Sequence, residues 1–236
     1  MLNYKFLLLD ADGTFLNFAL TEKIALDLLF DHYNLTHDEE TFSSYEEGNR
    51  LCWREFEQGI ISMDELKVKR FSLFFAKEGL HFDPSEANRL YVHYLASNGH
   101  YISGAEDVLK RLSHDYTLEV ITNGIASVQR GRLDALGASK YFDHIIISEE
   151  IGCQKPSAAF FEKTLEIIHA AKDECLIIGD SLTSDIKGGI ESGIDTCYLH
   201  LGKDPGISDT RIKYHASSYS ELLSIIYADQ VDIENK

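Results

Sequence analysis

Basic residues are few in this 236-residue chain, where 22 Lys and Arg face 39 Asp and Glu and the formal net charge is -17. Such an excess of negative charge repels the phosphates of nucleic acids and anionic membrane surfaces. We therefore expect no nucleic-acid polymer and no membrane as a partner. A small phosphorylated ligand is not excluded, because a few local donors outweigh a distant, screened field.

Cysteine pairs and long apolar runs are also missing. The four cysteines form no Cys-x-x-Cys pair and have no histidine at zinc-finger spacing, which is typical of reduced thiols. No apolar run approaches the roughly 20 residues that cross a bilayer. The N-terminus has no basic region and reaches Asp10 too early for a secretory signal. From these absences we expect a cytoplasmic protein.

The chain is organised around the segment Asp10-Ala11-Asp12-Gly13-Thr14, which follows the apolar run Phe6-Leu7-Leu8-Leu9. Such a run, ending in a turn signal, predicts a buried strand of a parallel sheet, and ligands of these sheets bind beyond the strand ends. Two carboxylates two residues apart repel each other unless a cation or a proton intervenes. The pattern indicates a nucleophile or metal ligand at Asp10 and an acid/base partner at Asp12. A polar strand end with a glycine turn is the alternative.

Hydrophobic periodicity divides the chain into two kinds of structure. Between residues 17 and 99 apolar residues recur at helical spacing, which predicts an all-helical insertion. From residue 100 onward helices alternate with short apolar strands, which predicts βαβ units. We expect an α/β fold, a doubly wound parallel sheet formed by residues 1–16 and 100–236, with a helical cap at residues 17–99. A last helix is expected at 219–227, followed by a loose tail at 229–236.

The ends of the next three predicted strands also carry polar or charged groups that can bind a phosphate or a metal ion. Thr122 and Asn123 follow the second predicted strand at a helix start, where backbone amides bind anions, although a threonine there also serves as a helix cap. Lys155 follows the third strand, and Asp180 with Asp185 follows the fourth. Several carboxylates with one lysine require a hard cation, and oxygen ligands favour Mg²⁺. Phosphoryl transfer is the chemistry that uses these groups together.

In order and spacing, the segments 10–14, 121–124, 155–156 and 179–185 resemble the four motifs of the haloacid dehalogenase-like (HAD) hydrolases. The helical insertion resembles the C1 cap of that family, so the resemblance covers nearly the whole chain. It implies a Rossmann-like core and a Mg²⁺-dependent reaction. Dehalogenases of the family lack the second carboxylate of the first motif, so the presence of Asp12 favours a phosphatase.

The resemblance also implies a role for each motif residue. Asp10 would be the nucleophile that forms an aspartyl-phosphate, and Asp12 would protonate the leaving oxygen and then activate water. Thr122 and the amide of Asn123 would hold phosphoryl oxygens. Lys155 would neutralise the nucleophile and the phosphate.

The implied metal ligands are the side chains of Asp10 and Asp180 and the backbone carbonyl of Asp12. Asp185 would position Lys155 or a metal-bound water rather than touch the metal. Many family members carry an aspartate at the position of Asn17. This residue lies where the chain enters the cap, so it either reaches the substrate or ends a turn.

The cap segment 49–60 resembles that of bacterial HAD-like nucleotidases that act on pyrimidine nucleoside monophosphates. In it, Trp53 offers an aromatic face to a base, and Arg54 lies off the apolar stripe, where it would meet a phosphate or a sugar. The alternatives are that Trp53 shares a packed helical face with Phe56 and that Arg54 is solvated.

We therefore expect a Mg²⁺-dependent phosphatase, acting as a monomer on a small phosphorylated metabolite, with a pyrimidine nucleoside 5′-monophosphate as substrate. One alternative is a sugar-phosphate phosphatase or a phosphomutase of the same superfamily, in which a sugar hydroxyl takes the phosphoryl group. Another is a non-catalytic binding module, which the retention of Asp10, Asp12 and Lys155 disfavours.

Overall fold

The computed structural model describes residues 4–202 and 209–228 and divides into two compact units. The core unit, within these residues, runs to Phe18, continues over His100–Ala126 and resumes at Gly137. The helical unit comprises Ala19–Gly99 and Ser127–Leu136. This grouping differs from the division expected from the sequence at residues 127–136, which periodicity places with the core. The predicted loose tail at 229–236 lies outside the described residues.

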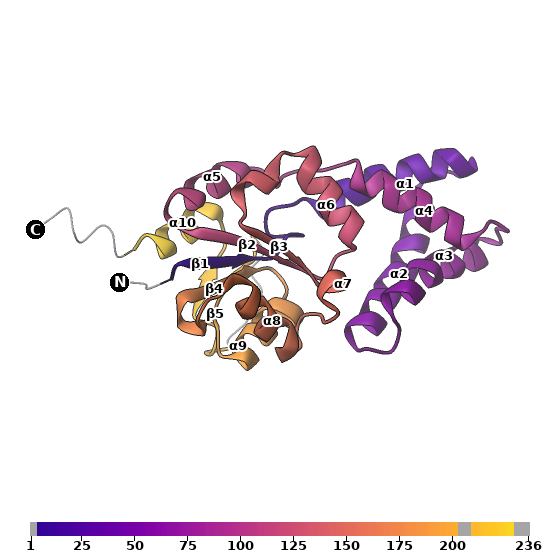
Figure 1. Ribbon diagram of the computed structural model, residues 1–236. Coiled ribbons are helices and arrows are strands. Elements are labelled where there is room, and N and C mark those ends of the chain that lie inside the picture. The colour runs from indigo at the N-terminus through magenta and orange to yellow at the C-terminus, as the bar shows by residue number, and fades with distance from the viewer. Residues whose placement is uncertain (1–3, 203–208, 229–236) are drawn as a thin grey trace, which may run out of the picture. The chain divides into compact units, whose positions relative to one another are not determined.

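The core unit contains a six-stranded, wholly parallel sheet in the order β3-β2-β1-β4-β5-β6 (Figure 1). This arrangement confirms the predicted fold class. The last strand was not predicted, because its three residues are too few to show a period. The strands are β1 (Phe6–Leu9), β2 (Thr117–Thr122), β3 (His144–Ile147), β4 (Cys175–Gly179), β5 (Asp195–Leu199) and β6 (Tyr214–Ala216).

The central strand β1 fixes where the site forms. In the register of the sheet, Leu9 lies beside Val120 of β2 and Ile178 of β4. Strands β1, β2 and β4 are buried along nearly their whole length, so most of their residues are apolar instead of alternating with polar ones, although β2 also buries Glu119 and Thr122. Because the three strands are parallel, the residues that follow them emerge at one edge of the sheet.

Helices cover both faces of the sheet, as a doubly wound fold requires. Figure 1 shows α5 and α10 on one side and α8 and α9 on the other. The helix predicted at 219–227 is confirmed as α10. The bounds are α5 (Ala105–Asp115), α7 (Ser148–Ile151), α8 (Ala158–Ile168), α9 (Lys187–Ser192) and α10 (Tyr219–Ile226), with short helical turns at Ala138–Tyr141, Lys172–Glu174 and Leu182–Ile186.

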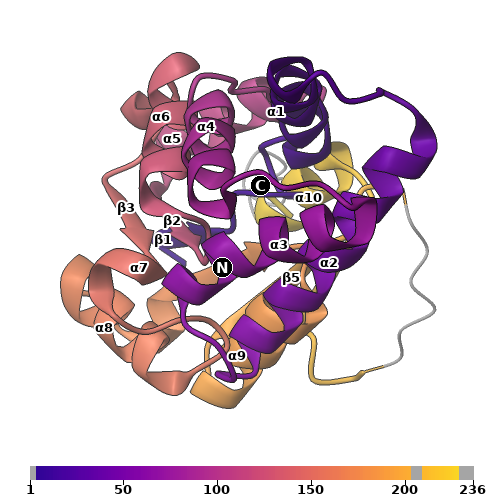
Figure 2. The same ribbon diagram turned by 90° about the vertical axis from the view of Figure 1, so that its right-hand side faces the viewer.

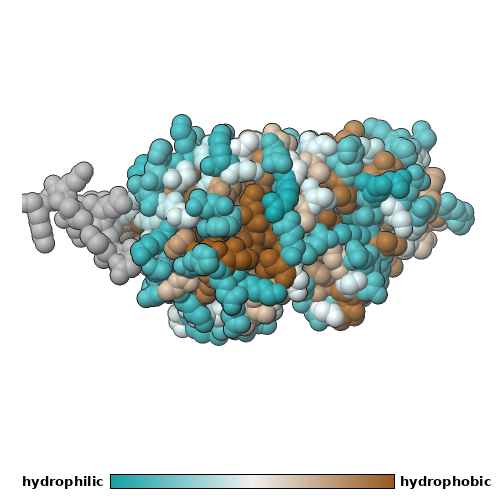
Figure 3. All heavy atoms as spheres, in the orientation of Figure 1, coloured by the Kyte–Doolittle hydropathy of each residue, from teal (hydrophilic) through white to brown (hydrophobic). Residues whose placement is uncertain are grey.

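A buried cluster joins the sheet to α8. Phe160 and Phe161 of this helix pack with Leu8, Ile121 and Ile177 of the three central strands. On the face of the core unit drawn in Figure 3, hydrophobic side chains gather near the open edge of the sheet, in the region of β2 and β3 in Figure 1, and hydrophilic ones surround them. Apolar burial against α8 therefore stabilises the sheet.

The segments by which the chain leaves and re-enters the core unit pair with each other. Leu16 and Tyr101 form an antiparallel bridge. Beside it, the amide of Asn17 donates to the carbonyl of His100 at 2.8 Å, and the amide of Ile102 donates to the carbonyl of Phe15 at 3.0 Å. Residues on these two segments are consequently held by backbone hydrogen bonds rather than by side-chain packing alone.

The helical unit is built from amphipathic helices with recognisable ends. Ser62 and Glu65 form a capping box at one helix start, and Asp83 caps another whose first residue is Pro84. In Figure 2, α2 and α3 lie side by side. The bounds are α1 (Phe18–Tyr33), α2 (Glu39–Glu57), α3 (Met63–Glu78), α4 (Pro84–Ala96) and α6 (Ala126–Ala135).

A close approach of α6 to the end of α4 explains why residues 127–136 belong to the helical unit. A Cβ at Gly131 would lie 2.7 Å from the carbonyl oxygen of Ala96, and a Cβ at Gly99 would overlap the carbonyl of Arg132. Only glycine allows the two backbones to come so near.

Within residues 4–202 and 209–228, no helix is long and apolar enough to cross a membrane.

Candidate active site

Lys155 is the centre of the polar groups at the carboxyl edge of the sheet. Its Nζ donates to Oδ1 of Asp10 at 2.6 Å, to Oδ1 of Asp185 at 2.6 Å and to the carbonyl of Ile121 at 2.8 Å. The lysine is 1% exposed. Burial lowers the pKa of Lys155, but the charges of Asp10 and Asp185 outweigh burial and raise it. The ammonium is therefore charged and is held by a carbonyl of β2 and by two carboxylates that follow β1 and β4.

Asn123 fixes the backbone of Lys155. Its Nδ2 donates to the Lys155 carbonyl at 2.8 Å, and its Oδ1 accepts from the Lys155 amide at 2.9 Å. The next peptide bond, Lys155–Pro156, is cis. The sequence assigns the backbone amide of Asn123 to the phosphate, which stays a prediction. The use of its side chain as a clamp on the lysine loop was not foreseen.

Three carboxylates meet beside the lysine. One oxygen each from Asp10, Asp180 and Asp185 lies within 4.8 Å of the others. Burial raises the pKa of Asp10 against the opposing charge of Lys155, and the charges of Asp185 and Asp180 raise it further. Burial, and then the charge of Asp185, raises the pKa of Asp180 to about 6. One lysine therefore does not compensate the whole negative charge, and an oxygen-only donor set of this kind fits a hard divalent cation.

Two glycines allow the carboxylates to come this close. A Cβ at Gly13, whose φ is 81°, would overlap the carboxylate of Asp180. A Cβ at Gly179 would overlap the carboxylate of Asp185 in the same way. At Gly13 both the positive φ and the close approach require glycine.

Both oxygens of Asp185 are engaged within the protein. Oδ1 accepts from Lys155, and Oδ2 accepts from the amide of Ser181 at 3.2 Å. The residue is fully buried on the turn Leu182–Ile186, which Ser181 caps by accepting from the Ser184 amide. These contacts suit the predicted positioning role of Asp185 better than a place among the metal ligands.

The loop after β1 curls back on itself and carries the second aspartate. The amides of Phe15 and Leu16 both donate to the Ala11 carbonyl, and Asp12 forms a parallel bridge with Leu16. The charge of Asp12 is among the causes that raise the pKa of Asp180, so the two carboxylates are near each other. Thr122, at the end of β2, is buried and accepts from the Gly124 amide at 3.1 Å.

Comparison with known proteins shows the family of the chain. The family model of the haloacid dehalogenase-like hydrolases matches residues 7–199. The chain belongs to this family. It is 38% identical to pyrimidine 5′-nucleotidase PynA of Streptococcus pneumoniae, covering 94% of this chain and 95% of that protein, and 30% identical to pyrimidine 5′-nucleotidase YjjG of Escherichia coli, covering 95% and 99%. The crystal structure of the HAD-hydrolase YfnB of Bacillus subtilis matches with a TM-score of 0.87 and 34% identity over 94% of this chain and 98% of that one.

Two predicted substrate residues of this HAD hydrolase lie on α2 of the helical unit. Trp53 is half-buried and packs edge-on against Phe56, with 5.8 Å between ring centroids, in a cluster that includes Cys52 and Leu66. Arg54 is exposed in the last turn of the helix. Trp53 therefore packs against Phe56, as the alternative to base binding expects. Substrate binding by Trp53 and Arg54 stays a prediction.

A cavity of about 340 Å³ opens beside the motif residues of the core unit. Sequence reasoning did not single out its wall from the end of β5, although a polar residue such as His200 after a strand end was a usable signal. The charge of Asp180 is the second cause, after burial, that raises the pKa of Tyr198 in this wall. The lining residues are Gly13, Asn17, Ile102, Asp180, Tyr198, Leu199, His200 and Leu201.

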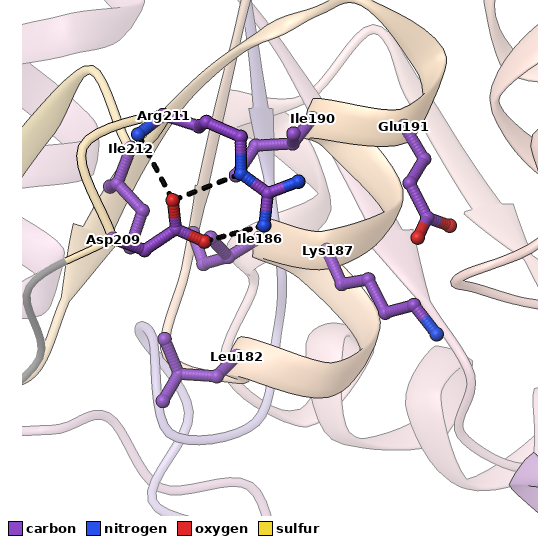
Figure 4. Close-up of a pocket in the computed structure, with 8 residues that line it drawn as sticks. All are labelled: Leu182, Ile186, Lys187, Ile190, Glu191, Asp209, Arg211 and Ile212. Carbon is purple, nitrogen blue, oxygen red and sulfur yellow. Dashed lines mark hydrogen bonds and ion pairs between the residues drawn. The ribbon is translucent and has the colours of Figure 1, made fainter.

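A second cavity of the HAD core, of about 220 Å³, contains none of the predicted site residues. Figure 4 shows Arg211 and Asp209 facing each other among its lining residues, where Arg211 Nη2 donates to Asp209 Oδ2 at 2.7 Å. Apolar side chains such as Ile186 and Ile212 also line it. Of its charged lining residues, Asp209 and Arg211 are paired with each other, and none of the motif residues lies in this cavity.

Proposed function

We propose that this HAD hydrolase is a Mg²⁺-dependent phosphatase that hydrolyses a pyrimidine nucleoside 5′-monophosphate through an aspartyl-phosphate on Asp10. The observation that carries the proposal is the pair of 2.6 Å hydrogen bonds by which buried Lys155 joins Asp10 to Asp185, with Asp180 alongside. A carboxylate nucleophile, a fixed cation and further oxygen ligands are the parts that phosphoryl transfer needs.

The metal would be held by the side chains of Asp10 and Asp180 and by the backbone carbonyl of Asp12. The raised pKa values of Asp10 and Asp180, caused first by burial and then by neighbouring charges, support a need for a cation besides Lys155. When bound, Mg²⁺ neutralises charge on the phosphoryl oxygens. The YfnB relative was crystallised with magnesium, which supports the same choice here.

The residues of the chain divide the chemistry among them. A carboxylate oxygen of Asp10 attacks phosphorus, and the bond from phosphorus to the ester oxygen breaks. Asp12 gives its proton to that oxygen, so the alcohol leaves neutral. Asp12 then takes a proton from water, which attacks the aspartyl-phosphate and releases inorganic phosphate. Thr122 and the amide of Asn123 hold phosphoryl oxygens. Lys155 neutralises the nucleophile and the phosphate, and its hydrogen bond keeps Asp10 oriented between turnovers.

The substrate class rests on the relatives. PynA and YjjG are both named pyrimidine 5′-nucleotidases, and each aligns with the chain over nearly its full length. The free thiols of the cysteines suit a reducing compartment, so we place the enzyme in the cytoplasm. We also propose a monomer, because Asp10, Asp180, Asp185 and Lys155 come together within one chain.

The test is release of inorganic phosphate from pyrimidine and purine nucleoside monophosphates and from hexose phosphates, with and without Mg²⁺. We expect Mg²⁺-dependent release that is fastest with the pyrimidine nucleotides. The control variant Asp10→Asn should lose about a thousandfold or more in kcat. Release from hexose phosphates alone would overturn the nucleotidase assignment. A requirement for a sugar bisphosphate would identify a phosphomutase, and no turnover of any ester would leave a binding module.

A further inference from the structure

The loop after β1, which carries Asp12, is closed by hydrogen bonds among its own residues. The amides of Phe15 and Leu16 donate to the carbonyl of Ala11 at 3.1 and 2.9 Å. The amide of Gly13 donates to the carbonyl of Leu16 at 3.0 Å. These bonds make the loop compact, but they do not fix where it lies relative to the sheet. Its place depends on the contacts that it makes with other parts of the core unit.

Tyr219 makes such a contact with the loop. Its hydroxyl donates to the carbonyl of Thr14 at 2.7 Å, across 205 residues of sequence. Thr14 is 1% exposed, so water replaces this hydrogen bond poorly. Burial raises the pKa of Tyr219, so the phenol keeps its proton and remains a donor. The phenol therefore links α10 to the residue two positions after Asp12.

Tyr219 itself is held on several sides. It is the first residue of α10, and Ser218 caps this helix by accepting from the amide of Glu221 at 3.2 Å. Glu221 in turn accepts from the amide and the hydroxyl of Ser217 at 2.8 and 2.7 Å. The tyrosine ring also lies against Gly104, where an added Cβ would be 3.5 Å from Cδ2 of the ring. The phenol is therefore a fixed point that can hold the loop.

Asp10 and Asp12 depend on the loop to different degrees. Asp10 directly follows β1, and its amide donates to the carbonyl of Ile178 at 2.9 Å. Its carboxylate accepts from Lys155. Asp12 comes two residues later, where its backbone pairs with Leu16 of the same loop. A shift of the loop therefore moves the acid/base aspartate, while the sheet and the lysine keep the nucleophile in place.

We propose that Tyr219 is a positioning residue for Asp12, because its hydroxyl holds the carbonyl of Thr14 and with it the loop that aims the Asp12 carboxyl at the ester oxygen. This inference rests on the proposed function and deepens it, since it concerns the step in which Asp12 gives its proton to the leaving oxygen. Tyr219 acts through Asp12 and needs no contact with the substrate. Its effect is therefore largest where the reaction needs that proton.

The test compares two aryl esters of similar size that differ in their need for a proton. Phenolate is a poor leaving group and needs protonation by an acid, whereas p-nitrophenolate leaves readily without it. The quantity measured is kcat/KM for phenyl phosphate and for p-nitrophenyl phosphate, and the ratio of the two values is compared between variants. Because kcat/KM reports the steps up to release of the phenol, later hydrolysis of the aspartyl-phosphate does not enter it.

Tyr227 provides a matched control on the same helix. It follows the last residue of α10, and its hydroxyl donates to Oδ2 of Asp115 at 2.8 Å. Asp115 ends α5 just before β2 begins, at the edge of the sheet opposite the site. Tyr219→Phe and Tyr227→Phe each remove one hydroxyl and keep the ring, so each should lower the thermal midpoint by about 2–4 °C. Only Tyr219→Phe should change the ratio.

We expect Tyr219→Phe to lower kcat/KM for phenyl phosphate about tenfold, and that for p-nitrophenyl phosphate by no more than about twofold. Asp12→Asn should show the same pattern with a loss of about a hundredfold or more on phenyl phosphate. In the double variant, Tyr219→Phe should add no further loss to that of Asp12→Asn, because the group that it positions is gone. Uridine 5′-monophosphate, whose leaving group also needs a proton, should follow phenyl phosphate.

Equal losses on the two aryl esters in Tyr219→Phe would overturn the inference, because a general distortion of the site slows both. An unchanged ratio, an equal change of ratio in Tyr227→Phe, or losses that add fully in the double variant would overturn it as well. If Tyr219→Phe does not fold, the same ratio is measured in Tyr219→Ser, whose short side chain admits water to the Thr14 carbonyl.

Failure of the proposed function is read from the wild-type enzyme instead. A wild type that hydrolyses the aryl esters but no nucleotide would remove the nucleotidase assignment, while the ratio of the two esters still decides the role of Tyr219. A wild type that hydrolyses none of these esters would overturn both the proposed function and the inference.

Discussion

Asn123 and Lys155 hold each other through two hydrogen bonds in opposite directions, from the asparagine Nδ2 to the lysine carbonyl and from the lysine amide to the asparagine Oδ1. The asparagine follows β2, and the lysine lies in the loop after the short helix α7. The pair ties the lysine loop to the end of a central strand. This places the ammonium between Asp10 and Asp185.

Loss of this clamp is expected to reduce catalysis more than substrate binding. In Asn123→Ala the Lys155 loop loses both bonds, and we expect kcat to fall about 10- to 100-fold, because small displacements of a positioned group are costly. Stability should fall by about 1–3 kcal/mol through the two unpaired backbone groups. Asn123→Asp keeps an acceptor for the Lys155 amide and should lie between the alanine variant and wild type. A change confined to KM in steady-state kinetics would contradict this role.

Gly13 and Gly193 provide a matched test of crowding at the acidic cluster. Both have a positive φ, 81° and 72°, but a Cβ at Gly193 meets nothing within 4 Å, whereas one at Gly13 overlaps the Asp180 carboxylate. Each alanine variant should lose about 1–2 kcal/mol in urea unfolding from the left-handed backbone. Only Gly13→Ala should also lose phosphatase activity, by about a hundredfold or more. Equal activity of the two variants would show that Asp180 moves aside without consequence.

Mg²⁺ is expected to stabilise the folded protein through the acidic cluster. A cation that binds only the folded state adds about 2.7 kcal/mol at one hundred times its dissociation constant, so the thermal midpoint should rise with Mg²⁺ and fall again with a chelator. Asp180→Asn should remove most of this shift. Asp209→Asn, which breaks the exposed pair with Arg211 outside the site, should leave it unchanged. A full shift in Asp180→Asn would exclude this aspartate as a ligand.

Glu119 gives a pH-dependent stability of predictable sign. Burial raises the pKa of Glu119. The amide and Nδ1 of His144 donate to the Glu119 carboxylate and lower this pKa in part, whereas the charge of Asp143 raises it. The folded state therefore retains the proton more tightly than the unfolded state, and stability is lost as pH rises from the unfolded pKa through the raised one. Glu119→Gln, which imitates the protonated acid, should have a higher thermal midpoint than wild type at neutral pH.

The difference in thermal midpoint between Glu119→Gln and wild type should vanish near pH 4, where the Glu119 carboxyl of the wild type is protonated in both the folded and the unfolded state. Glu221 provides a control of opposite sign, because its carboxylate accepts from the amide and hydroxyl of Ser217 and its pKa is lowered. Glu221→Gln should be less stable than wild type at neutral pH. The thermal midpoints of both variants are measured from pH 4 to pH 8. If they depend on pH in the same way as that of wild type, the pKa shifts of Glu119 and Glu221 do not contribute to stability.

The strands that carry the site were predictable because their environment is uniform. β1, β2 and β4 are buried on both faces, so each is rich in consecutive apolar residues and is followed by polar ones, with the buried Glu119 of β2 as the exception. β6 was missed because three residues with mixed exposure have no period. Helix α6 was predicted as a helix but was expected in the core, since the close approaches of Gly131 to Ala96 and of Gly99 to Arg132 exist only in the folded chain.

The sequence by itself determined the order of strands and helices and the kinds of group at the strand ends, because period and turn chemistry are local properties. Only the tertiary structure decided which of these groups touch. Lys155 meets Asp10 across 145 residues and Asn123 across 32, and His200 stacks on Tyr198 beside a cavity whose other wall lies near residue 17. Such contacts depend on sheet register and on glycines that admit close approach, and neither appears in the pattern of a single segment.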